Sequence, residues 1–165
     1  MAAGNTYEAI ATTTPAALTT TVTFSSIPST YTDLVLVLNV TNYNASVEDS
    51  DVRFNSDSGS NYSWTRIEGD GSSAGSGRGT STTSIPLALA ASGSGGGTAI
   101  WSIQNYANTT TYKTALYRNN LPATKLNAFV GLWRSTAAIS TITITKGGNG
   151  FAANSTFSLY GIKSA

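Results

Sequence analysis

Carboxylates are the groups in this sequence best suited to acid–base chemistry, and six of the eight acidic residues lie between positions 48 and 70. They are Glu48, Asp49, Asp51, Asp57, Glu68 and Asp70. A pair of carboxylates can hydrolyse glycosides, but acidic side chains in turn-rich segments more often form turns or lie in solvent. The chain has no histidine and no cysteine, so the commonest general base, thiol nucleophiles and thiolate metal sites are excluded. We predict no catalytic residue and no enzymatic activity.

The segment NSDSGSN at 55–61 is the one candidate metal site. Asn55, Asp57 and Asn61 fall at alternate positions around a glycine, a spacing that can present oxygen ligands to calcium. The segment is not an EF-hand, because the twelfth position holds Arg66 instead of glutamate. The alternative is a hydrogen-bonded turn, since Asn, Asp and Ser side chains bond to nearby backbone. No cofactor is expected.

The tryptophans offer stacking platforms for sugars. Trp101 and Trp133 lie in apolar segments and are expected to pack in the core. Trp64 and Tyr62 follow the turn at 58–60 and are better placed for a surface.

The elements that position these residues are predicted to be β-strands. Serine and threonine make up 48 of the 165 residues, charged residues only 10% against about 25% in an ordinary domain, and no stretch has helical periodicity. Short strands separated by Gly, Asn, Pro and Ser favour one antiparallel β-sandwich domain over residues 1–165, with about eight to eleven strands and essentially no helix. The expected strands are 7–13, 20–24, 33–40, 51–54, 62–68, 84–89, 99–104, 112–118, 127–133, 139–146 and 156–163.

Three segments are expected to lie outside the strands. Residues 1–6 form a possible N-terminal arm, and residues 69–83 and 90–98 are Gly/Ser-rich and are predicted to be surface loops. The continuous apolar run Leu34–Leu38 predicts a strand buried on both faces, either in the sandwich centre or beneath a neighbouring subunit.

Charge is divided between the two halves of the chain. Residues 1–70 carry all eight acids and two bases, and residues 71–165 carry seven bases and no acid. The charges either neutralise one another across the sandwich or form an acidic and a basic pole that promote head-to-tail contacts. A net charge of +1 without a basic aromatic cluster disfavours nucleic-acid binding. No long apolar run or signal peptide is seen, so no membrane contact is expected.

Several phrases of the sequence resemble a family of virion proteins from marine and cyanobacterial tailed phages. These are FSSIPSTYTDLVLVLNV at 24–40, RFNSDSGSNYSWTRIEGDGSS at 53–73, GLWRSTAAI at 131–139 and the closing FSLYGIK at 157–163. The resemblance implies a jelly-roll-like β-sandwich on the virion surface, in a family whose members are attached to heads or to tails.

From this resemblance we expect a non-enzymatic capsid decoration, or cement, protein on the outside of the head shell. It would be made in the host bacterial cytoplasm, bind the major capsid protein and form a homotrimer. A compact domain without a fibrous shaft, in which a strand begins at Tyr7, favours the head over the tail. The alternative is a tail-fibre or baseplate adaptor, or a glycan-binding receptor domain. The candidate interface residues are Ala3, Asn5, Thr6, Ser73, Ser76, Arg78 and Thr80.

Overall fold

The computed structural model describes residues 6–41, 50–87, 96–121, 125–147 and 150–163, and these residues form strands and turns without a helix. No membrane-spanning helix is therefore found in the described ranges. The strands are β1 (Tyr7–Thr13), β2 (Thr21–Phe24), β3 (Asp33–Val40), β4 (Ser50–Phe54), β5 (Tyr62–Gly69), β6 (Ala74–Thr82), β7 (Ile85–Pro86), β8 (Gly97–Gln104), β9 (Lys113–Leu121), β10 (Lys125–Trp133), β11 (Ile142–Lys146) and β12 (Thr156–Ile162).

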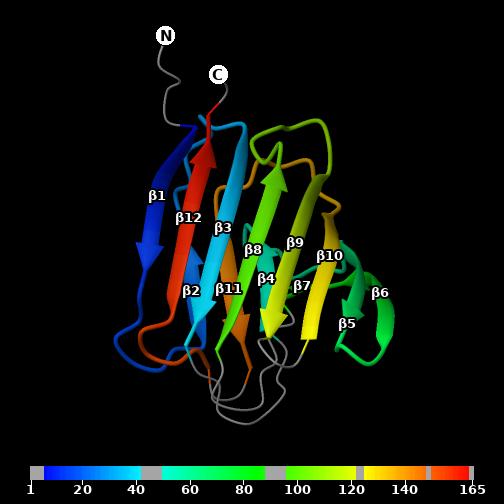
Figure 1. Ribbon diagram of the computed structural model, residues 1–165. Helices are drawn as coiled ribbons and strands as arrows, with labels where there is room; N and C mark the ends of the chain where they lie inside the picture. Colours follow the sequence, from blue (N-terminus) through cyan, green and yellow to red (C-terminus); the bar gives the residue numbers. More distant parts are fainter. Residues whose placement is uncertain (1–5, 42–49, 88–95, 122–124, 148–149, 164–165) are drawn as a thin grey trace.

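The strands form two antiparallel sheets packed face to face, so the predicted β-sandwich is confirmed (Figure 1). The larger sheet has the order β1-β12-β3-β8-β9-β10-β5-β6, and the smaller has the order β2-β11-β4-β7. β1 pairs with β12, β2 with β11, β3 with β8 and β4 with β7. This nested pairing, divided between two sheets, is the topology of a jelly roll. β9–β10 and β5–β6 are additions that widen the larger sheet beyond the smaller one.

Strand β6 corrects the prediction that residues 69–83 form a loop. Glycines 75, 77 and 79 alternate along β6 on the face that carries Trp64, Arg66 and Glu68 of β5, and each glycine lies directly opposite one of these side chains. A Cβ on Gly79 would lie 2.5 Å from Trp64 Nε1 and one on Gly77 3.2 Å from Arg66 Nε. The large side chains of β5 thus cover the glycines of the edge strand.

The other segment boundaries differ less from the predictions. The described part of the chain contains twelve strands, one more than the predicted upper limit. Gly97 and Thr98 belong to β8, although residues 90–98 were expected to form a loop, and the positions before 96 in that segment lie outside the described residues. β7 is limited to Ile85–Pro86, and β11 begins at Ile142 instead of position 139.

An aromatic ladder crosses the inner face of the larger sheet. The rings of Trp101 and Tyr117 stack at 3.7 Å between centroids, and those of Tyr117 and Phe129 at 4.5 Å. Phe129 also contacts Trp64 at 6.2 Å. The ladder therefore connects neighbouring strands β8, β9, β10 and β5 and confirms that Trp101 packs in the core. Trp133 is buried as predicted, whereas Tyr62, which was expected at a surface, is fully buried.

Strand β3 is covered on one face only. Leu34, Leu36 and Leu38 are fully buried between the sheets, whereas Val35 and Val37 point to the opposite face and are half-buried. The prediction that this apolar strand is buried on both faces inside the sandwich is therefore wrong. The face that carries Val35 and Val37 is open to contacts with another molecule. The second alternative, burial beneath a neighbouring subunit, requires such an open face.

Candidate interaction surfaces

Two rows of mostly apolar side chains cross the outer face of the eight-stranded sheet. Directly paired residues form one row of Tyr160, Val35, Ser102, Leu116 and Val130, and a second row of Val37, Ile100, Arg118, Ala128 and Ile67. The seven large hydrophobic residues that are most exposed in the described structure include Tyr7, Ile67, Leu116, Leu126 and Val130, all of which lie on this face. We call this surface the outer face.

A shallow hollow of about 680 Å³ lies in the middle of the outer face. Val35, Val37, Ile100 and Leu116 contribute to its lining, and Arg118 is the only charged residue among the described residues that line it. Apolar side chains that are exposed side by side on a soluble protein are a feature of interaction sites. The outer face is therefore the main candidate binding surface of this fold.

The candidate calcium segment forms a turn whose oxygens already accept hydrogen bonds. Asp57 Oδ2 accepts from Trp133 Nε1 at 2.7 Å and from Asn61 Nδ2 at 2.9 Å, and Asp57 Oδ1 accepts from the Gly59 amide at 2.8 Å. Asn55 Oδ1 accepts from the amides of Ser140 and Thr141. These contacts point the ligand oxygens at protein donors, so the geometry favours the hydrogen-bonded turn over a calcium site.

The turn ties three elements together. Asn55 and Ser56 adopt positive φ angles of 50° and 56°, a conformation in which Asn is favoured among non-glycine residues. The buried Tyr62 hydroxyl accepts from the Phe54 amide at 3.0 Å, and burial raises the pKa of Tyr62 to about 12. The turn thereby fixes the ends of β4, β5 and β10 against one another.

The carboxylates considered for catalysis take up other contacts. Hydrogen bonds, first from Trp133 and then from Asn61, hold the pKa of Asp57 below its usual range. Amides of Ser73 and Ser72 lower the pKa of Asp70. A glycosidase acid needs a raised pKa instead. Glu68 lies between Arg66 and Lys125 at 3.3 and 3.4 Å, and Glu48 and Asp49 lie outside the described residues. Among the described residues, no group of three His, Cys, Asp or Glu side chains suits a metal ion.

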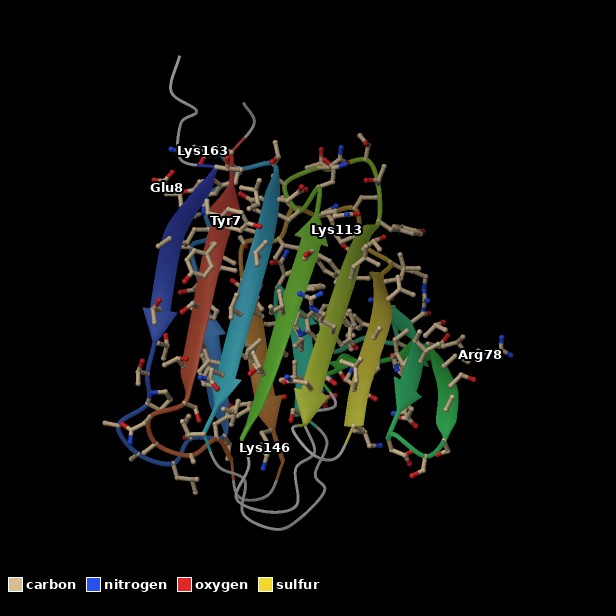
Figure 2. The ribbon with its side chains drawn as sticks, in the orientation of Figure 1. Tyr7, Glu8, Arg78, Lys113, Lys146 and Lys163 are labelled. Carbon is tan, nitrogen blue, oxygen red and sulfur yellow. The ribbon has the colours of Figure 1, made fainter. Side chains whose placement is uncertain are left out.

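The predicted interface residues do not form one patch. Ala3 and Asn5 lie outside the described residues, and Thr6 is exposed beside β1. Ser73 is in the turn before β6, while Ser76, Arg78 and Thr80 are exposed on β6, on the same side of the sheet as the outer face. Figure 2 shows Arg78 at the opposite edge of the sheet from Tyr7. Seven strand spacings of ~4.8 Å separate the two edges by roughly 34 Å. The apolar residues between these edges were not predicted as interface residues from the sequence. Their alternation with buried residues along each strand was a usable signal for a second apolar face.

Acidic side chains of residues 1–70 form ion pairs with basic side chains of residues 71–165 in the folded chain. Lys163 Nζ lies 2.5 Å from Glu8 Oε2, and Lys125 pairs with Glu68, so acids of the first half neutralise bases of the second. Figure 2 places Lys113 and Lys146 near opposite ends of the sandwich, and both are buried. These contacts favour neutralisation over two charged poles.

Lys113 is a buried cation that binds backbone. Its Nζ donates to the carbonyl oxygens of Thr111 at 2.7 Å and Thr136 at 3.2 Å, and burial lowers its pKa. It therefore links the segment before β9 to the segment after β10. This is a structural contact.

Comparisons with known proteins leave the family open. No family model matches this chain, and a search of curated proteins finds no match. The resemblance to phage virion proteins therefore stays a prediction.

Proposed function

We propose that this protein is a non-enzymatic structural protein of a phage virion. In this proposal it is a capsid decoration protein that binds the outside of the head shell as a homotrimer and stabilises it. The sequence resemblance supports the virion assignment, and the jelly-roll topology agrees with the fold which that resemblance implies. The observation that carries the proposal is the uncovered outer face, because β3 supplies Val35 and Val37 to it without an internal partner.

The outer face gives the proposal an energetic basis. Fully burying a large apolar side chain contributes about 1.5–3 kcal/mol, and Leu116 and Val130 retain 46% and 40% of their exposure in the isolated chain. Completing the burial of each would add about 1 kcal/mol. A protein that binds the assembled shell and not its free subunits stabilises the shell by mass action, and many copies multiply a modest contact. The partner of this face is the major capsid protein.

Counting copies per virion tests the proposed location. Quantitative mass spectrometry against the major capsid protein should give hundreds of copies for a decoration protein. A handful to a few tens of copies would contradict the decoration role and favour a vertex or tail. Light scattering on the purified protein should give the mass of a trimer, and a monomer would contradict that part of the proposal.

A variant of the outer face tests the docking surface. Leu116→Glu places a charge at the hollow and should weaken binding to shells stripped of the protein at least tenfold. The variant should also fail to give the increase in shell melting temperature that the wild type gives. Leu18→Glu is the matched control, because Leu18 is 63% exposed and precedes β2, away from the outer face. Equal binding by the Leu116 and Leu18 variants would exclude the outer face as the docking surface.

The second candidate is a tail-fibre or baseplate adaptor, or a receptor-binding domain. It is favoured by a groove that Asp51, Trp64 and Arg66 help to line, because shell binding through the outer face does not need this second surface. The copy number separates the two candidates.

A further inference from the structure

A groove of about 470 Å³ lies where the larger sheet extends beyond the smaller one. One wall is the edge formed by β4 and β7, and the other is the β5–β6 hairpin. The residues that matter for binding are Asp51, Trp64, Arg66, Thr82 and Thr83, which together supply an aromatic ring, a carboxylate, a guanidinium and two hydroxyls. The volume lies within the ~300–1,000 Å³ typical of small-ligand sites.

Trp64 is held rigidly in this groove. The indole lies against the backbone of Gly79, where an added Cβ would approach Cε2 to 2.7 Å, and it contacts Phe129 at the end of the aromatic ladder. The guanidinium carbon of Arg66 lies 5.9 Å from the Trp64 ring centroid. The side chain is nevertheless partly exposed, unlike Trp101 and Trp133. It is therefore an ordered aromatic surface that remains accessible to a ligand.

The opposite wall is also fixed. Tyr117 Oη donates to the Pro86 carbonyl at 2.6 Å, and Asn119 Nδ2 donates to the Leu87 carbonyl at 2.5 Å. Arg53 Nε donates to the Thr83 carbonyl at 3.1 Å. Both walls are thus positioned before any ligand arrives, which lowers the entropic cost of binding.

The charges around the groove indicate the kind of ligand. Arg66 pairs with Glu68 at 3.3 Å, and Glu68 also pairs with Lys125, so the positive charge of Arg66 is partly neutralised. With Asp51 and with Arg53, which contacts the Thr83 carbonyl, these five groups carry a net charge of only +1. Because the opposite charges lie close together, the groove has little net attraction for a strongly charged ligand. Its hydroxyls, carboxylate and guanidinium offer both donors and acceptors beside an aromatic ring.

We infer that this groove binds a neutral saccharide, with a sugar ring packed against Trp64 and its hydroxyls hydrogen-bonded by Asp51, Arg66 and Thr82. Sugar C–H groups are apolar and sugar hydroxyls are polar, so a ligand of this class satisfies both kinds of groove surface. The site lies on the face of the sheet opposite the outer face. The protein is therefore able to hold a glycan while the outer face is occupied.

Affinity electrophoresis through neutral polysaccharides (glucan, mannan and galactan), with polygalacturonate as the acidic comparison, tests this inference. At least one neutral polymer should retard the wild-type protein and quench its tryptophan fluorescence. Trp64→Ala should weaken that binding at least tenfold. Thr83→Tyr, which fills the groove without removing a packed side chain, should do the same. The matched control is Tyr112→Ala, since Tyr112 is an exposed aromatic residue outside the groove.

Each outcome decides the inference. No retardation by any neutral polymer, retardation by polygalacturonate alone, or binding that survives both groove variants would overturn it. If Trp64→Ala unfolds, the Thr83→Tyr protein supplies the answer. The result is separate from the proposed decoration role, because that role is read from copy number and from the Leu116→Glu variant.

Discussion

Removing the Asp57 carboxylate should destabilise the protein mainly through Trp133. In the folded chain Asp57 Oδ2 accepts the indole N–H of Trp133 at 2.7 Å, and Trp133 is only 2% exposed. In Asp57→Ala the backbone N–H of Gly59 and the side-chain amide of Asn61 can return to water, because both residues are exposed. The indole N–H loses its charged acceptor in a buried site, which costs about 2–3 kcal/mol.

A double-mutant cycle isolates this contribution. Trp133→Phe retains an aromatic ring beside Phe54 and Tyr62 but removes the N–H donor. If the hydrogen bond dominates, Asp57→Ala should cost much less in the Trp133→Phe background, giving a coupling energy of about 1–2 kcal/mol. Urea unfolding followed by circular dichroism measures the four free energies. A coupling energy below about 0.5 kcal/mol would refute the reasoning, because independent sites add within that limit.

The same contact has a pH signature. Because the pKa of Asp57 is lowered in the folded protein from 3.8, its contribution to stability is fully present above 3.8 and is lost as the pH falls through the folded value. Asp57→Asn should therefore lose less stability than the wild type on acidification through this range. Parallel curves for the two proteins would show that the carboxylate charge does not contribute.

The calcium hypothesis for residues 55–61 has a separate test. The melting temperature of the wild type is measured with calcium and with chelator, and we expect no difference.

Two further changes test other contacts. Gly79→Val should displace Trp64 from β6 and lower the free energy of unfolding by about 1–3 kcal/mol. The control is Thr80→Val, on the opposite face of the same strand, which should change the free energy of unfolding by less than about 0.5 kcal/mol. Equal urea midpoints for the two variants would contradict the close packing of Trp64 on Gly79. The pKa of Lys113 is lower in the folded protein than its ordinary value of 10.5. As the pH rises from the folded pKa toward 10.5, the folded protein loses the buried charge before the unfolded chain loses its proton, so the cost of burying the charge falls. The stability of the wild type relative to Lys113→Met should therefore increase over this range, and a difference independent of pH in urea titrations would contradict the buried charge.

The sequence predicted the sandwich because its core strands alternate clearly. In β11, Ile142 and Ile144 are buried and Thr143 and Thr145 are half-buried, as a period of two requires. The nested pairing that defines the jelly roll depends on contacts between residues more than a hundred positions apart, such as Tyr7 with Ile162. Local patterns do not encode such pairs, and here the expectation came from family resemblance.

Other features depended on neighbouring strands. The glycines of β6 indicated a loop, because a glycine-rich segment lacks strand propensity until large side chains from β5 cover it. Lys113 is one of the seven bases of the second half that were expected either to neutralise acids or to form a basic pole, yet its ammonium group donates to backbone carbonyls of two segments. The groove combines residues of β4, β5, β6 and β7 with the turn between β6 and β7, so no single sequence window contained it.

The nested pairing of strands also constrains how the chain folds. β12 lies between β1 and β3, so the larger sheet cannot close until residues 156–162 have left the ribosome. Until then, β1 and β3 have unpaired edges, and β3 exposes a continuous apolar run that is prone to aggregate. Folding dominated by such distant pairings is intrinsically slow. Deletion of β12 should therefore yield insoluble protein instead of a smaller stable sandwich.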